Sequence, residues 1–199
     1  MLKTATTAAN ENLWEACAMA LDDITRRLRR ITAALEEKSV PYAVVGGQAV
    51  AIWVATREPA AVRTTKDVDL LIRRDDLPRA RAAALSVEMD YFEVMGVGMF
   101  LERGDPNPRN AVHLVWAGER VRPEYELPSP PVDQRQEISG IHAISLPGLV
   151  LMKLLSNRDQ DRVHLRDMID VGLVERDLLG GLPSSLAKRL DALLSESGR

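Results

Sequence analysis

The sequence predicts one domain of the α/β or α+β class, with a mixed β-sheet, flanking helices and a C-terminal helical cap. The chain has 199 residues, a length that suits one domain with a proper core. Short β-branched segments occupy the first two-thirds of the chain, and helical periodicity occupies the last third. We therefore expect a single domain over 1–199, with an N-terminal helix (1–40), a sheet core (41–144) and a helical cap (145–199).

The composition narrows the function classes. Hydrophobic residues make up 46% of the chain and aromatic residues only 4%, which indicates a globular protein with an aliphatic core. The net charge of −3 provides no overall attraction to nucleic acid, so an RNA partner would need a local basic patch. The single Cys17 excludes an internal disulfide framework. Without a span-length apolar run or signal-peptide core, we expect a cytoplasmic protein with no membrane association.

The predicted elements follow the apolar periodicity. Residues 1–10 are expected to be frayed, and 12–38 to form a helix whose arginines are either a solvated face or an RNA surface. Proline and glycine mark the loops, and the segment 123–131, with four prolines, is expected to lie extended on the surface or act as a lid. Strands are predicted at 42–45, 67–72, 91–95, 99–102, 111–116 and 141–144, and helices at 48–56, 75–89, 147–155, 159–174 and 182–194. Asp75 or Asp76 is expected to cap the helix that follows it.

Two acids in one predicted strand are the first candidate site. Residues i and i+2 of a strand point to the same face, so Asp67 and Asp69 are expected to project together. Two close carboxylates repel unless a cation or proton lies between them, and Mg²⁺ often binds one or two carboxylates plus substrate phosphates. The alternative is a surface strand whose acids pair with neighbouring cations such as Arg63 or Lys66.

A glycine pair is the second candidate. Gly46 and Gly47 stand where a predicted strand becomes a helix, so backbone N–H groups there can approach an anion. Tight turns alone would also explain two glycines. The chain lacks both the GxGxxG fingerprint and the GxxxxGK[ST] loop, which excludes the Rossmann and P-loop interpretations.

Together these stretches resemble a known superfamily. Gly46-Gly47-Gln48-Ala49, followed by the run from Arg63 to Asp69 (RTTKDVD), is similar to the pattern of the DNA polymerase beta-like nucleotidyltransferases. More narrowly, it resembles the AbiEii-type and minimal nucleotidyltransferases, some of which belong to toxin–antitoxin pairs. The resemblance is strongest over 42–72 and implies a nucleotidyltransferase-like fold.

The resemblance also implies an activity. It implies metal-dependent transfer of a nucleoside monophosphate from a nucleoside triphosphate to an RNA (tRNA) or protein acceptor, with Mg²⁺ or Mn²⁺ as cofactor and an antitoxin as a partner. The two acids would bind the metal, in keeping with a clamp on the attacking and leaving oxygens. The nucleotide-binding residues implied are Gly46, Gly47, Gln48, Arg63, Thr65 and Lys66.

The third metal ligand departs from the family pattern. The superfamily usually has a further carboxylate on a later strand, whereas the matching segment here, 111–116, offers His113. Imidazole is a poor Mg²⁺ ligand but suits Mn²⁺ or Zn²⁺, and its ordinary pKa near 6.5 also suits a general base. The alternative is a hydrogen-bonded core histidine.

The predicted C-terminal helices contain the last candidates. Lys153 stands alone in an apolar run, and the AbiEii-type proteins have a lysine on a comparable helix with an acid on the next, which Asp167 resembles. Lys153 and Asp167 are therefore candidate catalytic residues, or else a salt bridge that holds the cap on the sheet. His164 shares a helical stripe with Asp167. A catalytically weak nucleotide-binding or protein-interaction module is the competing function.

Overall fold

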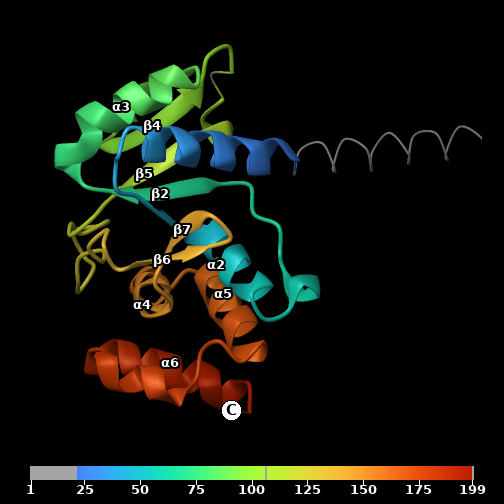
Figure 1. Cartoon of the computed structure of the whole chain (residues 1–199). Helices are drawn as coiled ribbons and strands as arrows, with labels where there is room; N and C mark the ends of the chain where they lie inside the picture. The colour runs from blue at the N-terminus through green and yellow to red at the C-terminus, as the bar shows by residue number, and fades with distance from the viewer. Residues whose placement is uncertain (1–21, 106, 199) are drawn as a thin grey trace, which may run out of the picture.

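A seven-stranded mixed sheet forms the centre of the molecule and confirms the predicted fold class (Figure 1). The computed structural model describes residues 22–105 and 107–198, so the expectations for residues 1–10 and for the first part (12–21) of the helix predicted over 12–38 lie outside it. The strands run in the order β3-β4-β5-β2-β1-β7-β6. Their bounds are β1 Ala43–Val45, β2 Val68–Ile72, β3 Met89–Val94, β4 Val97–Glu102, β5 Val112–Trp116, β6 Arg135–Ile138 and β7 Ile141–Ile144.

The central strands are buried because each has neighbours on both sides and helices over its faces. β1 pairs antiparallel with β2 and parallel with β7, while β2 pairs parallel with β5. β4 pairs antiparallel with both β5 and β3. Leu70, Leu71 and Ile72 on β2 have no exposed surface, as expected of an apolar strand in the middle of a sheet.

Helices cover the two sheet faces unevenly. The helix over residues 22–37 and α3 (Leu77–Ser86) lie on one side of the sheet in Figure 1, and α2 (Gly46–Ala55) with the C-terminal helices lies on the other. α2 packs against β1, β2 and β7. The C-terminal helices are α4 Leu146–Ser156, α5 Asp159–Asp170 and α6 Ser184–Glu196, and all three pack against one another.

Most predicted elements are present, with local differences. α2 begins two residues before the prediction, at Gly46, and the β3–β4 turn falls at Met95 and Gly96. β6 was not predicted, because it is a mostly polar edge strand that lacks the apolar pattern of a buried strand. Asp76 stands at the N-cap of α3, but its carboxylate makes no capping bond; it accepts hydrogen bonds from Arg73 and Arg79 instead.

The first helix uses two of its arginines as contacts to the sheet. Arg27 is only 7% exposed and its Nε lies 3.7 Å from Oε1 of Glu102. Arg30 donates to the same oxygen at 3.1 Å and to the carbonyl of Val87. Neither a solvated face nor an RNA surface describes these two side chains, because both are committed to protein partners. In the described residues, no helix is long and apolar enough to cross a bilayer.

Candidate functional site

The junction between β1 and α2 brings the glycine pair against the acidic strand. Gly46 has a φ of +66°, a conformation that glycine adopts at little cost. A Cβ built on Gly46 would lie 2.0 Å from Oδ2 of Asp69, so only a residue without a side chain leaves room for that carboxylate. The register explains the approach, because Val45 and Asp69 are partners across β1 and β2.

The next residues hold the loop before β2 against the start of α2. A Cβ on Gly47 would lie 2.5 Å from Oγ1 of Thr65, and Nε2 of Gln48 donates to the carbonyl of Thr65 at 3.2 Å. No side chain caps the N-terminus of α2, and its first turn holds no acid. The first N–H groups of a helix carry partial positive charge, so this end suits a phosphate. Four of the predicted nucleotide-binding residues therefore lie together: Gly46, Gly47, Gln48 and Thr65.

Asp69 and His113 are neighbours on adjacent parallel strands. They are register partners, and Nδ1 of His113 lies 3.9 Å from Oδ1 of Asp69, with each side chain 27% exposed. Burial raises the pKa of Asp69, and the nearby Asp67 raises it further, while His113, Lys153 and Arg158 act in the opposite direction. Asp67 is exposed and lies one residue before β2 begins.

The donor set fits a hard divalent cation in part. Asp69 is partly desolvated and lies near the Asp67 carboxylate, so a bound cation would stabilise the charged form of both groups. However, residues 22–105 and 107–198 contain no group of three or more His, Cys, Asp or Glu side chains placed to hold a metal ion. The predicted set of Asp67, Asp69 and His113 is thus not gathered as a three-ligand cluster, and Asp67 with Asp69 remains the pair suited to Mg²⁺.

Lys153 forms a buried ion pair with Asp161, a residue that was not among the predicted site residues. Nζ of Lys153 lies 3.0 Å from Oδ1 of Asp161, and the two side chains are 6% and 1% exposed. Arg158 donates to Oδ2 of the same carboxylate at 2.8 Å. These two cations hold the pKa of Asp161 at about 2, although burial alone would raise it. One carboxylate therefore fixes a cation from α4 and a cation from the start of α5.

The proposed bridge between Lys153 and Asp167 is wrong, because Asp167 binds a different residue. Nε of Arg63 donates to both carboxylate oxygens of Asp167, at 2.9 and 2.8 Å. The alternative that Arg63 or Lys66 pairs with Asp67 or Asp69 is also wrong, since none of these ion pairs forms in the described chain. Arg63 instead ties the loop before β2 to α5, and Lys66 is exposed to solvent.

His164 lies on the same helix, one turn after Asp161. It is 8% exposed, and its Nδ1 has no hydrogen-bond partner among the residues described. Burial, and secondarily the charge of Lys153, lowers its pKa to about 4. His164 is therefore neutral near pH 7 and adds no charge beside the Lys153–Asp161 pair.

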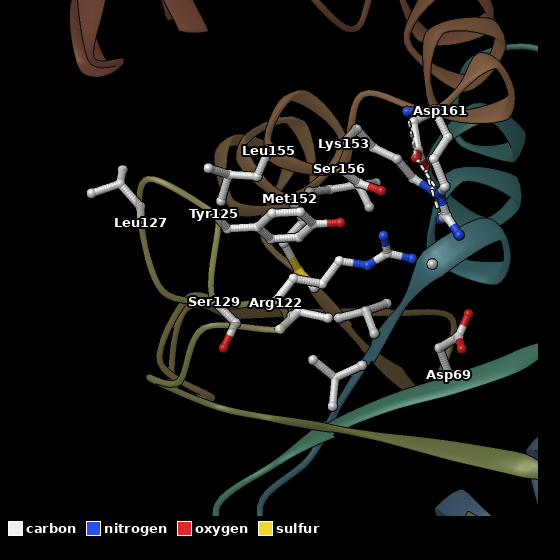
Figure 2. A pocket seen from close by; sticks show the side chains of 16 residues that line it. Asp69, Arg122, Tyr125, Leu127, Ser129, Met152, Lys153, Leu155, Ser156 and Asp161 are labelled. Carbon is white, nitrogen blue, oxygen red and sulfur yellow. Dashed lines mark hydrogen bonds and ion pairs between the residues drawn. The ribbon is translucent and has the colours of Figure 1, made fainter. Parts of the chain in front are cut away.

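A pocket of about 230 Å³ joins these parts (Figure 2). Gly46 and Asp69 line one side of it, and Lys153, Arg158 and Asp161 line another. In Figure 2, the side chain of Arg122 extends between the Tyr125 ring and Asp69. The remaining lining residues are mainly apolar: Val45, Val115, Val121, Leu127, Ser129, Leu149, Met152, Leu155 and Ser156. The site thus combines a carboxylate, several cations and an apolar wall with an aromatic ring.

The proline-containing segment supplies one wall of the pocket. Ser129 is buried, donates through Oγ to the carbonyl of Trp116, and forms backbone bonds with Gly118 and Glu119. A turn in which Tyr125 N–H donates to the Arg122 carbonyl places both side chains at the pocket. These two residues, like Arg158 and Asp161, were not among the predicted site residues. The single useful signal was the conspicuous loop itself.

One of the solved structures similar to this chain supports the fold. The structure is similar to that of an antigenic nucleotidyltransferase-like protein from Paracoccidioides brasiliensis, with a TM-score of 0.56, 19% identity and 88% of each chain covered. Weaker similarities include the antibiotic-resistance factor ANT(2'')-Ia, with a TM-score of 0.48, 15% identity, and 87% of this chain and 91% of that chain covered. Another is the Megavirus polyadenylate synthase, with a TM-score of 0.40, 10% identity, and 89% and 36% covered.

No protein-family model matches the sequence, and no curated protein sequence matches it. The first structural similarity shows a nucleotidyltransferase-like fold. At 19% identity this similarity shows the fold alone, because one fold can carry many different activities.

Proposed function

We propose that this protein is a metal-dependent nucleotidyltransferase that moves a nucleoside monophosphate from a nucleoside triphosphate to a hydroxyl group of an RNA or protein acceptor. The observation that carries the proposal is the contact of the Asp69 carboxylate with Gly46 at the uncapped N-terminus of α2. A carboxylate that suits a metal ion therefore lies beside a helix N-terminus that suits a phosphate.

The nucleotide fits across the pocket that begins at this contact. The phosphates are expected at the N-terminus of α2, within the field of Arg122, Lys153 and Arg158. The base and sugar are expected against the apolar wall, where the Tyr125 ring offers a surface for stacking. A pocket of about 230 Å³ accommodates part of a nucleotide, so the remainder would extend toward solvent.

The metal would be held by Asp69 and Asp67, because His113 is not gathered with them into a three-ligand site in the described residues. When bound, Mg²⁺ or Mn²⁺ supplies positive charge for the phosphate oxygens and lowers the pKa of a coordinated hydroxyl. The chain's own cations complement this charge from the other side of the pocket. Asp161 keeps Lys153 and Arg158 in place for that purpose.

The transfer follows from this arrangement. The acceptor oxygen forms a bond to the α-phosphorus, the bond to the β-phosphate bridging oxygen breaks, and pyrophosphate leaves. We expect His113 to receive the acceptor proton, because it lies beside Asp69 with part of its side chain accessible. The GG and RTTKDVD pattern further supports the AbiEii-type or minimal subclass and a toxin–antitoxin role with an antitoxin partner.

The test is transfer of label from α-labelled nucleoside triphosphates, in Mg²⁺ or Mn²⁺, to a defined RNA pool and to a defined protein pool. We expect labelled acceptor with the wild type and none with Asp69→Asn. Asp177→Asn is the matched control for loss of a carboxylate charge, because Asp177 is exposed and does not line the pocket. If the wild type transfers no label with either metal, the enzyme proposal fails.

A nucleotide-binding module without transfer is the second candidate function. It is favoured by His113 in the place of a third carboxylate and by the lack of a three-ligand cluster among the described residues. Calorimetry with ATP and GTP separates the two candidates. Binding without pyrophosphate release, for every acceptor and metal tried, would support the module.

A further inference from the structure

One row of side chains leads from the candidate site to the edge of the sheet. Asp69 on β2 is the register partner of His113 on β5, His113 is the partner of Met99 on β4, and Met99 is the partner of Phe92 on β3. Directly opposed residues on neighbouring strands point to the same face. The four side chains therefore lie in one row on the face that carries the candidate site.

The far end of this row is exposed and apolar. Phe92 is 47% exposed, Val94 55%, Val97 46%, and Met95 at the hairpin tip 99%. Val94 and Val97 are register partners on the face that carries Phe92. We call these four side chains the hairpin patch. In the part of the chain that the structure describes, β3 has no strand beyond it, so one side of its backbone is open to another strand.

Helix α3 does not cover the hairpin patch. The guanidinium of Arg81 on α3 lies over the ring of Tyr91, 5.1 Å from the ring centroid. Successive side chains of a strand point to opposite faces, so Tyr91 lies on the face opposite to Phe92. α3 therefore packs on the other face of β3. α2 packs against β1, β2 and β7, at the far side of the site from the hairpin patch.

The charge of the hairpin selects the kind of partner. Between Met89 and Glu102 the sequence contains three acids, Asp90, Glu93 and Glu102, and no lysine or arginine. Asp90 and Glu102 are paired with arginines, whereas Glu93 is exposed and accepts a hydrogen bond from the Tyr91 hydroxyl. A polyanion such as RNA gains no phosphate contact from this segment. A second copy of the same hairpin would place Glu93 near its own equivalent, which opposes edge-to-edge pairing.

We propose that the hairpin patch is the docking surface for a polypeptide acceptor, an extended segment with alternating apolar residues and at least one lysine or arginine. On one face its apolar side chains would cover Phe92, Val94 and Val97, and on the opposite face its cation would lie beside Glu93. Its backbone would pair with the open edge of β3. The link to an acceptor rests on the proposed function, whereas the docking surface itself does not.

The spacing of the strands sets where the modified hydroxyl lies. β3 and β2 are three strands apart, and neighbouring strands are about 4.8 Å apart, so Phe92 and Asp69 are separated by about 14 Å across the face. The docked segment would lie one strand spacing beyond β3, about 19 Å from Asp69, and an extended chain advances about 3.3 Å per residue, so about six residues bridge this distance. The hydroxyl-bearing residue is accordingly expected about six residues or more from the apolar segment.

A random dodecapeptide display library, selected against the full-length protein, tests the proposal. The selected peptides are expected to alternate apolar residues and to contain lysine or arginine. Their affinity, measured by fluorescence anisotropy, is expected to fall about tenfold or more in a Phe92→Ser, Val94→Thr variant. The matched control is Leu85→Ser, because Leu85 is 55% exposed, like Val94, but lies on α3.

Four results would overturn the proposal. They are failure to select any peptide, equal affinity for the double variant, displacement of the peptide by a 20-nucleotide RNA, and a wild-type dimer in sedimentation equilibrium that the double variant lacks. Calorimetry with ATP distinguishes failure of the docking surface from failure of the proposed function. The double variant is expected to bind ATP as the wild type does, because none of its changes lies in the pocket.

Discussion

The carboxylate of Asp69 occupies the space that a side chain on Gly46 would need, with Oδ2 2.0 Å from the position of a Cβ. This relationship joins the two sequence patterns, because it makes the glycine necessary for the placement of the acid. Gly46 is therefore required for two reasons. Its φ of +66° disfavours a residue with a side chain, and the Asp69 carboxylate fills the space that such a side chain would need.

Substitution of Gly46 distinguishes these two roles. Gly46→Ala is expected to cost more than the roughly 1–2 kcal/mol of a left-handed alanine, because Asp69 has to move as well. Gly96→Ala is the matched control, since Gly96 has a φ of +80° but no atom within 4 Å of a Cβ. Denaturant unfolding measures both costs. Equal costs for the two variants would show that the Asp69 contact is unimportant.

Removal of the Asp69 charge is expected to stabilise the metal-free protein. Burial raises the pKa of Asp69, so its charged form is disfavoured in the folded state at neutral pH. Asp69→Asn should therefore raise Tm, by roughly 2–4 °C for each kcal/mol gained. The same variant is expected to lose the additional stabilisation that wild type gains from Mg²⁺ with ATP.

The Tm of each protein, recorded with and without Mg²⁺ and ATP, tests both expectations. Asp67→Asn is the control in the ligand-free state, because Asp67 is exposed and its removal should change the Tm less. An Asp69→Asn protein less stable than wild type without metal would contradict the account.

Asp161 is expected to matter more for stability than Asp167, although both are acids on α5. Asp161→Asn leaves the buried ammonium of Lys153 without its carboxylate, a change that costs roughly 3–5 kcal/mol in buried pairs. Asp167→Asn removes a partner of Arg63, whose side chain is 66% exposed, so we expect a loss below about 1 kcal/mol. Urea unfolding of the two variants provides the comparison. Similar losses of unfolding free energy in the two variants would mean that Lys153 is not held in a buried ion pair with Asp161.

His164 is expected to reduce stability in mildly acidic solution. Its pKa is lowered from 6.5 to about 4 in the folded protein, so the unfolded chain takes up a proton first as the pH falls. The stability contributed by neutral His164 is therefore complete above pH 6.5 and is lost toward pH 4. Unfolding free energies measured across this range should fall less steeply for His164→Gln.

Asp161 does not interfere with that measurement. Its pKa is lowered from 3.8 to about 2, so its contribution is present above the ordinary value and disappears only as the pH falls through that lower range. If wild type and His164→Gln show the same slope between pH 6.5 and pH 4, the histidine is not buried in its neutral form.

The half of the site that is built from residues close together in the sequence was predictable. Gly46, Gly47, Gln48 and Thr65 lie together as expected, because a short strand and the following helix leave few ways to arrange them. His113 was selected through the family resemblance, and the parallel pairing of β2 with β5 brings it into register with Asp69. Their roles in binding and catalysis remain predictions.

The partner of Lys153 was not predictable from sequence. Asp161 and Asp167 both lie on the helix after Lys153, and they are six residues apart, which rotates them by about 120° around the helix axis. Only one of them can face Lys153, and the short connection between α4 and α5 selects Asp161. Periodicity describes one helix at a time, so it carries no information on how two helices meet.

The sequence by itself determined the fold class and the acid–glycine half of the site, because strand alternation, helical periodicity and the glycine positions are local properties of the chain. Only the tertiary structure decided the other half. The approach of Arg122, Tyr125, Lys153 and Arg158 to Asp69 depends on how a loop and two helices pack against the sheet. That packing results from the fit of many apolar side chains at once, and no single segment encodes it.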